Sequence, residues 1–212
     1  MSRRLYMTIG AAAITGALTA ALLVVLSASG NSNTPVNPPN AASTLYSVYS
    51  ADRPQAIFPA AIENAAQNLV VTDKSGAPAE VLTGDKVPGT ERLLLDKPSA
   101  LGLEVYGFAT TSGRVCEIVP GIMAGCDKGS VQTDPVVWMS GGPVGGPAII
   151  TGIARDGVKS VSVVIDGKSQ PTSLANNTFY REIPLDELSK VTSLVVTMKD
   201  SSEVTIDIGP LA

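Results

Sequence analysis

The residues with the clearest chemical potential are the two cysteines of the stretch CEIVPGIMAGC, Cys116 and Cys126, which are the only ones in this 212-residue chain. Two thiols at this spacing could bind a metal, form a redox pair, include a catalytic thiol, or close a structural disulfide. The chain has no histidine. This excludes Ser-His-Asp triads, Cys-His dyads and the usual zinc sites that contain histidine, and two cysteines cannot complete a four-cysteine site.

Few catalytic mechanisms remain open without histidine. No lysine has a serine three residues before it, so the S-x-x-K arrangement is absent as well. A hydrolase that uses two carboxylates is the common mechanism still open. We therefore predict no catalytic, metal or cofactor residues and no cofactor, and we keep a carboxylate-pair hydrolase acting on envelope polymers as an alternative. The net charge of −4 also disfavours nucleic acid as a partner.

The N-terminus predicts export. Arg3 and Arg4 precede an uncharged apolar run from Leu5 to Leu26, which is long enough to cross a bilayer as a helix. A cleaved signal peptide is the alternative, but its apolar region is usually shorter. We favour a single-pass anchor with a cytoplasmic N-terminus and an extracytoplasmic C-terminal part, which would be secreted if the leader is cleaved.

Small residues recur on one side of this predicted helix, at Ala12, Gly16 and Ala20. Such a row allows close packing against another membrane helix. A regulator of a membrane partner, acting through this row, is therefore a second alternative. An alanine-rich anchor without a helix partner explains the same row.

Export also bears on the cysteines, because oxidising compartments favour disulfides over free thiols. Pro120 and Gly121 lie near the middle of the enclosed loop and form a turn pair. The C-x-x-C spacing and helix start of redox pairs are missing. We predict a Cys116–Cys126 disulfide across a hairpin.

The composition divides the chain into four parts. We predict a membrane anchor or signal peptide at 1–29, a flexible linker rich in Asn, Ser and Pro at 30–43, a disulfide-stapled region at 44–134 and a second β-rich region at 135–212. The last two parts could form one unit. Helical spacing predicts one short helix around 59–68, and short β-type runs dominate after 91.

The C-terminal region has the clearest strand signals. An alternating strand ends at Asp166-Gly167, a strong hairpin signal. Pro171 places the returning strand at an edge or a bulge. Strands at this spacing predict a small antiparallel, immunoglobulin-like sandwich, so the fold class is mainly β with one short helix. GIARDGVKS at 152–160 nearly matches a phosphate loop, but the following residues alternate as a strand does, so we interpret it as a tight turn.

Three aromatic residues could contribute to a binding surface. Trp138 lies beside glycines and could stack on a ligand, whereas a half-buried core position is the usual alternative. Tyr46 and Tyr49 follow the linker and could form an exposed pair or pack at the domain edge.

Several stretches together resemble an uncharacterised family of actinobacterial cell-envelope proteins. The resemblance rests on SADRPQAIFPA, the Arg92-Leu93-Leu94 stretch, the RVCEIVPGIMAGC pair and GIARDGVKSVSVVIDGK with NNTFYREIP. It covers most of residues 50–208 and implies a fold and a compartment, but no activity or site residues. We expect a non-catalytic, membrane-anchored binding or scaffolding protein of the cell envelope, with a protein or an envelope polymer as its partner.

Overall fold

The computed structural model describes residues 41–72, 78–83, 85–96, 101–126, 134–143 and 145–211, and this part of the chain is mainly antiparallel β-structure, as predicted. The predicted membrane segment and the row of Ala12, Gly16 and Ala20 lie outside the described residues. Within them, no helix is long and apolar enough to cross a membrane. Helix α1, Ala41–Leu45, begins inside the stretch predicted as linker.

An outer layer consists of α2, Ala60–Gln67, and the hairpin of β1, Asn68–Thr72, with β2, Pro78–Thr83. The helix starts directly after Pro59, whose missing N–H is no loss in the first turn, and it confirms the helix predicted around 59–68. Ile62 and Ala66 are buried on one side of α2, where they contact aromatic residues of the next layer.

The first sheet has the strand order β3-β4-β5-β6. Its strands are β3, Arg92–Leu95; β4, Val105–Ala109; β5, Val115–Val119; and β6, Met123–Cys126. Alternate residues of β4 and β5 face opposite sides, and both strands are buried throughout. Tyr106 and Phe108 pack against the outer layer, whereas Val105 and Ala109 face the next sheet.

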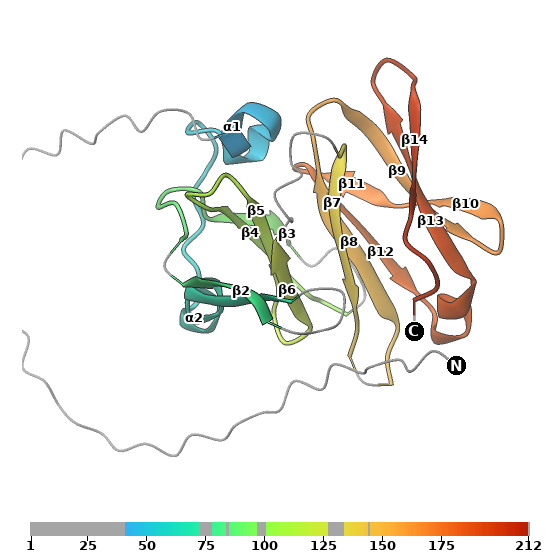
Figure 1. Cartoon of the computed structure of the whole chain (residues 1–212), viewed down its shortest axis with the longest axis horizontal. Helices are drawn as coiled ribbons and strands as arrows, with labels where there is room; N and C mark the ends of the chain where they lie inside the picture. The colour runs from blue at the N-terminus through green and yellow to red at the C-terminus, as the bar shows by residue number, and fades with distance from the viewer. Residues whose placement is uncertain are drawn as a thin grey trace, which may run out of the picture.

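The central sheet has the order β11-β12-β8-β7, and it is covered on both faces (Figure 1). Its strands are β7, Val136–Gly141; β8, Ala148–Ala154; β11, Ser173–Ala175; and β12, Thr178–Ile183. Ile149 and Ile153 of β8 contact the first sheet, and Ile150 contacts the sheet on the other side. A continuous core therefore crosses the boundary predicted at 134/135.

The C-terminal sheet has the order β10-β9-β13-β14 and packs face to face with the central sheet around an apolar core (Figure 1). Its strands are β9, Val158–Ile165; β10, Lys168–Pro171; β13, Val191–Met198; and β14, Glu203–Asp207. Asp166 and Gly167 join β9 to β10 with φ of 51° and 72°, which confirms the predicted two-residue hairpin.

The stretch after this hairpin differs from the prediction, because it does not return as a single strand. Lys168–Pro171 pairs with β9, and Ser173–Ala175 pairs with β12 in the other sheet. The chain passes from one sheet to the other at Pro171 and Thr172. Pro171 has no N–H to donate to a neighbouring strand, whereas the Thr172 N–H still donates to the Val161 carbonyl at 3.0 Å. One sequence run therefore supplies an edge strand to each sheet.

The structure corrects the prediction that Tyr46 and Tyr49 could form an exposed pair for binding. They are 0% and 3% exposed and belong to the core between the first and central sheets, so they lie at no surface. Buried Arg92 holds this N-terminal segment in place, because its guanidinium donates to the carbonyls of Val48, at 2.7 Å, and Ser50, at 3.0 Å. The segment includes the 3₁₀ turn η1, Ser47–Tyr49.

Candidate functional site

A pocket of about 240 Å³ lies at one end of the two C-terminal sheets. Its walls come from four places that are distant in sequence: the N-terminal segment around Ser47 and Arg53, the β8–β9 turn, the β11–β12 turn, and Lys199 after β13. The turn predicted within GIARDGVKS is the β8–β9 turn, and that prediction is confirmed. The pocket is therefore assembled from loops carried by paired strands.

The β11–β12 turn consists of Asn176 and Asn177, with φ of 48° and 61°. Two consecutive residues in this left-handed region make a type I′ turn, which matches the twist of the flanking strands. Asparagine tolerates this conformation better than most residues with a side chain. Asn176 also donates its amide to the Leu94 carbonyl at 3.2 Å, so the turn is attached to the first sheet.

The side-chain amide of Asn177 connects three elements. Its nitrogen donates to the Ala154 carbonyl at 2.9 Å and to Asp156 Oδ1 at 2.8 Å. Its oxygen accepts from the Val48 N–H at 3.1 Å and from the Ser47 hydroxyl at 3.2 Å. Both donors and both acceptor positions of the amide are therefore used, and Asn177 serves to position the pocket wall.

Asp156 is held as a carboxylate on the pocket wall. Its Oδ1 also accepts the Ser47 N–H at 2.9 Å. Burial opposes its ionisation, but the hydrogen bonds from Ser47 and Asn177, with the charge of Lys199, outweigh burial and lower the pKa of this carboxyl. The negative charge of Asp156 is thus already committed to holding the N-terminal segment.

Three cationic side chains, Arg53, Arg155 and Lys199, line the same pocket. Within the described ranges, none of them forms an ion pair. The Arg155 guanidinium is notable because its Nε and Nη2 are buried and have no hydrogen-bond partner there. The pocket therefore has an excess of positive charge over its one carboxylate.

Trp138, the other aromatic residue singled out in the sequence, does not lie on the pocket. It is half-buried on β7 and packs against the core between the central and C-terminal sheets. The sequence drew attention to the stretches around Arg155 and Asn177, but only as turns or strand starts. Asn-Asn before a strand is a turn signal, whereas nothing local indicates that Asn177 binds Ser47 and Asp156.

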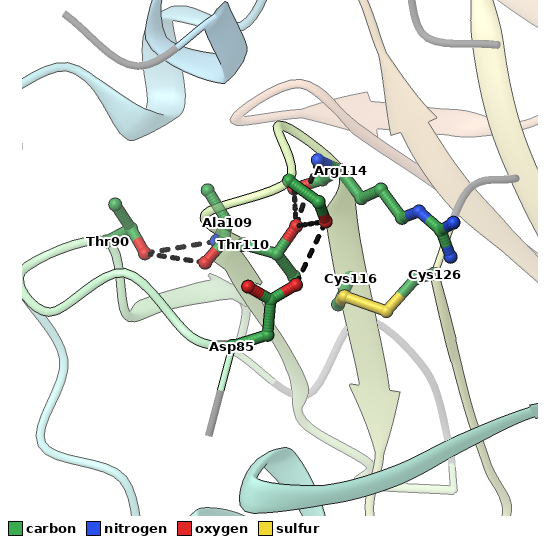
Figure 2. Close-up of a disulfide and its surroundings, with 8 residues drawn as sticks. Asp85, Thr90, Ala109, Thr110, Arg114, Cys116 and Cys126 are labelled. Atoms are coloured by element: carbon green, nitrogen blue, oxygen red, sulfur yellow. Dashed lines mark hydrogen bonds between the residues drawn. A yellow bond between two sulfur atoms is a disulfide. The ribbon is translucent and has the colours of Figure 1, made fainter. Parts of the chain in front are cut away.

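The Cys116–Cys126 disulfide is confirmed, and it joins directly opposed residues of β5 and β6 across a hairpin (Figure 2). Both cysteines lie in strands rather than at a helix start, and Cys116 is fully buried. The nearby β4–β5 turn is held separately, because the Ser112 hydroxyl donates to Asp85 at 2.9 Å. This geometry fits a structural staple.

Two carboxylates come together at Lys86, whose Nζ lies 2.7 Å from both Glu63 and Glu91. The Lys86 hydrogen bond lowers the pKa of Glu63. At Glu91 burial acts against ionisation, but the bond to Lys86 and two backbone N–H groups outweigh it and lower the pKa. Both carboxyls are therefore held ionised, whereas a glycosidase pair needs one protonated acid.

Glu117 is the one carboxyl group among the described residues whose pKa is raised. It lies on β5 between the first and central sheets, and burial raises its pKa to about 8, although the Thr151 hydroxyl at 2.6 Å acts in the opposite direction. Thr151 Oγ1 also lies 3.0 Å from the Phe179 carbonyl, which can only accept. The chain of hydrogen bonds is complete when Glu117 is protonated and donates to Thr151.

No group of three or more Cys, Asp and Glu side chains suited to a metal occurs among the residues that the structure describes. Comparisons with protein-family models, with curated proteins and with solved structures found no match for this chain. The resemblance to actinobacterial envelope proteins therefore stays a prediction.

Proposed function

We propose that this chain is a non-catalytic, membrane-anchored binding module of the cell envelope, and that its binding surface is the loop end of an immunoglobulin-like sandwich. The strand orders support the comparison with immunoglobulin domains. Labelled A to G in chain order, with β10 as an added C′ strand, the sheets become D-E-B-A and C′-C-F-G. The constant-type immunoglobulin domain pairs A, B, E and D against C, F and G.

The observation that carries the proposal is the position of the pocket. In this labelling its walls are the B–C, D–E and F–G turns, with the N-terminal segment lying beside them. Immunoglobulin variable domains bind their ligands through loops at this end. Loops on a rigid sandwich can present a specific surface without disturbing the core, which is a common basis for binding.

The test is site-specific photo-crosslinking of the full-length chain in cells. The crosslinking residue replaces Ala175, which is exposed on the pocket rim. A matched control replaces Leu185, which is 56% exposed in η2, Leu185–Lys190, at the opposite end of β12. We expect reproducible products from position 175 and not from position 185.

Two outcomes would contradict the proposal. Identical products from both positions would indicate unspecific contact, and products from neither would leave the loop end without a ligand. Crosslinks confined to a residue placed in the predicted membrane helix would instead favour a regulator of a membrane partner. Mass spectrometry of the same sample would identify the true N-terminus and thus distinguish an anchor from a cleaved leader.

A further inference from the structure

We propose that the loop-end pocket is an oxyanion site, in which Arg155, Arg53 and Lys199 bind one carboxylate or phosphate group of the ligand. The inference rests on the proposed binding function and specifies its chemistry. The three cations come from three separate elements, yet they line one pocket. None forms a direct ion pair in the part of the chain that the structure describes, although the charge of Lys199 acts on Asp156 from a distance.

Arg155 provides the most specific argument. Its unpartnered atoms are Nε and Nη2, which lie on the same edge of the guanidinium and can bind two oxygens of one anion side by side. Buried donors without a partner are rare in folded proteins and cost free energy. Both nitrogens are covered by protein atoms in the conformation described, so a bound oxyanion would remove this cost once the side chain has turned toward the pocket. Because the side chain is only partly buried, a rotamer change can turn this edge toward the pocket.

The neighbouring carboxylate does not satisfy this need. Asp156 accepts hydrogen bonds from Ser47 and Asn177, which fix the pocket wall, and it forms no ion pair with Arg155 or Arg53. The pocket volume of about 240 Å³ is below that of most drug-sized sites. The site therefore fits one anionic group of a larger ligand, and carboxylate and phosphate share the chemistry that it recognises.

The experiment is an NMR titration of the ¹⁵N-labelled full-length chain in an uncharged maltoside detergent. Sodium acetate and inorganic phosphate are added separately, and chloride is removed to hold ionic strength constant. We expect saturable shifts of the Asn177 and Asp156 amides. If acetate binds more tightly, the natural group is a carboxylate, and if phosphate binds more tightly, it is a phosphate ester.

Three variants sharpen the result. Arg155→Gln should weaken anion binding about tenfold, since it removes a charge and the two-donor edge. Arg155→Lys retains the charge but loses that edge, so binding should be weakened by a smaller factor. Lys168→Gln removes one exposed positive charge on β10, away from the pocket, and should change affinity less than twofold.

The proposal is wrong if neither anion causes saturable shifts at these amides, or if Lys168→Gln weakens binding as much as Arg155→Gln. If Arg155→Lys binds the anion as tightly as the unmodified chain, the paired Nε and Nη2 donors of Arg155 do not contribute to binding. Each variant spectrum must retain the dispersion of the folded protein. If no anion binds but the chain with the crosslinking residue at position 175 still gives specific products, this inference alone is overturned. If no anion binds and position 175 gives no specific products, the proposed function is overturned as well.

Discussion

The central sheet has two buried faces that differ in chemistry. The face toward the C-terminal sheet, here called the apolar face, buries Ile150 and Phe179, and Arg181 on the same face donates to the Pro171 carbonyl of β10. The opposite face, here called the polar face, also buries Ile149 and Ile153, but it carries Thr151, which meets Glu117 of the first sheet. The two interfaces are therefore equally buried but differ in polarity. The interface between the first and central sheets retains titratable and hydrogen-bonding groups.

Packing on the apolar face depends on a close contact at Gly152. A Cβ placed on Gly152 would lie 2.7 Å from the Phe179 ring and 2.0 Å from the Val137 carbonyl oxygen. Only glycine allows the ring to cover the strand in this way. The polar face depends instead on a chain of hydrogen bonds, which is sensitive to protonation. The two faces should therefore respond to different perturbations.

The largest effect should come from truncation on the apolar face. Phe179→Ala removes a fully buried ring and should lower the free energy of unfolding by about 3–5 kcal/mol, with little dependence on pH. Urea denaturation at two pH values measures both quantities. Leu185→Ala, at an exposed position, is the control and should change stability by less than about 0.5 kcal/mol. A loss for Phe179→Ala no larger than for the control would disprove tight packing on this face.

The polar face should make stability depend on pH. Glu117 has an ordinary pKa of 4.5 and a folded pKa of about 8, so the folded state holds a proton that the unfolded state releases between these values. Stability from this group is complete below pH 4.5 and is lost as pH rises toward 8, at about 1.4 kcal/mol per pH unit.

Glu117→Gln should abolish this slope, because glutamine is neutral throughout and can still donate to Thr151. We expect similar stabilities for the variant and the parent near pH 5 and a more stable variant near pH 8, measured by thermal unfolding. Equal pH profiles for the two proteins would show that Glu117 does not titrate in this range. Glu91 and Asp156 do not interfere, since their lowered pKa values place their effects at acid pH.

The disulfide lies between the first sheet and the outer layer, on the face of the first sheet that is turned away from the central sheet. Its cysteines are separated by 10 positions. Closing a loop of this length lowers the entropy of the unfolded chain and stabilises the folded protein by about 2–3 kcal/mol. The double substitution Cys116→Ala with Cys126→Ala should lose about this amount, with the same pH profile as the parent. Reduction of the parent by dithiothreitol is the matched comparison, and a change in the pH slope would tie the disulfide to the polar face.

The smallest effect concerns the edge of the polar face, where Asn177 holds the N-terminal segment. Asn177→Gly keeps the left-handed turn but loses the bonds to Ser47, Val48 and Asp156, so it should cost about 1–2 kcal/mol. Asp166→Gly is the control, because Asp166 occupies the same left-handed position of the β9–β10 turn, away from the pocket, and the substitution adds the same chain entropy. Chemical denaturation should show a larger loss of stability for Asn177→Gly than for Asp166→Gly, and proteolysis near Arg53 should be faster in Asn177→Gly. Equal losses of unfolding free energy in the two variants would mean that the hydrogen bonds of the Asn177 amide do not stabilise the N-terminal segment.

Local patterns predicted much of the fold. The Asp166-Gly167 hairpin, the alternating strand before it and the helix after Pro59 all follow from φ preferences and side-chain periodicity, which act within a few residues. The disulfide followed from the cysteine spacing and the expected compartment. Beyond the predicted helix and a single helical turn expected at LDEL, which is η2, the described residues contain α1 and η1. These short turns depend on packing rather than on a periodic pattern.

The candidate site was far less predictable. Arg155 and Asn177 lie in stretches that already indicated turns or strand starts, but their role depends on Ser47, which precedes Asp156 by 109 positions. Tyr46 and Tyr49 were equally ambiguous, since the same residues suit a surface or a core. No local rule states which loops will meet, because that depends on which sheet faces pack together.

The sequence by itself determined the β-rich class, the two-residue hairpin, the cysteine pair and the lack of histidine chemistry, because each depends on residue type, spacing or short-range backbone preference. Tertiary structure alone decided the stacking of the three four-stranded sheets, the burial of Glu117 against Thr151 and the meeting of three cations at one pocket. These features arise from long-range contacts, in which desolvation and charge are set by neighbours that the chain brings together only on folding.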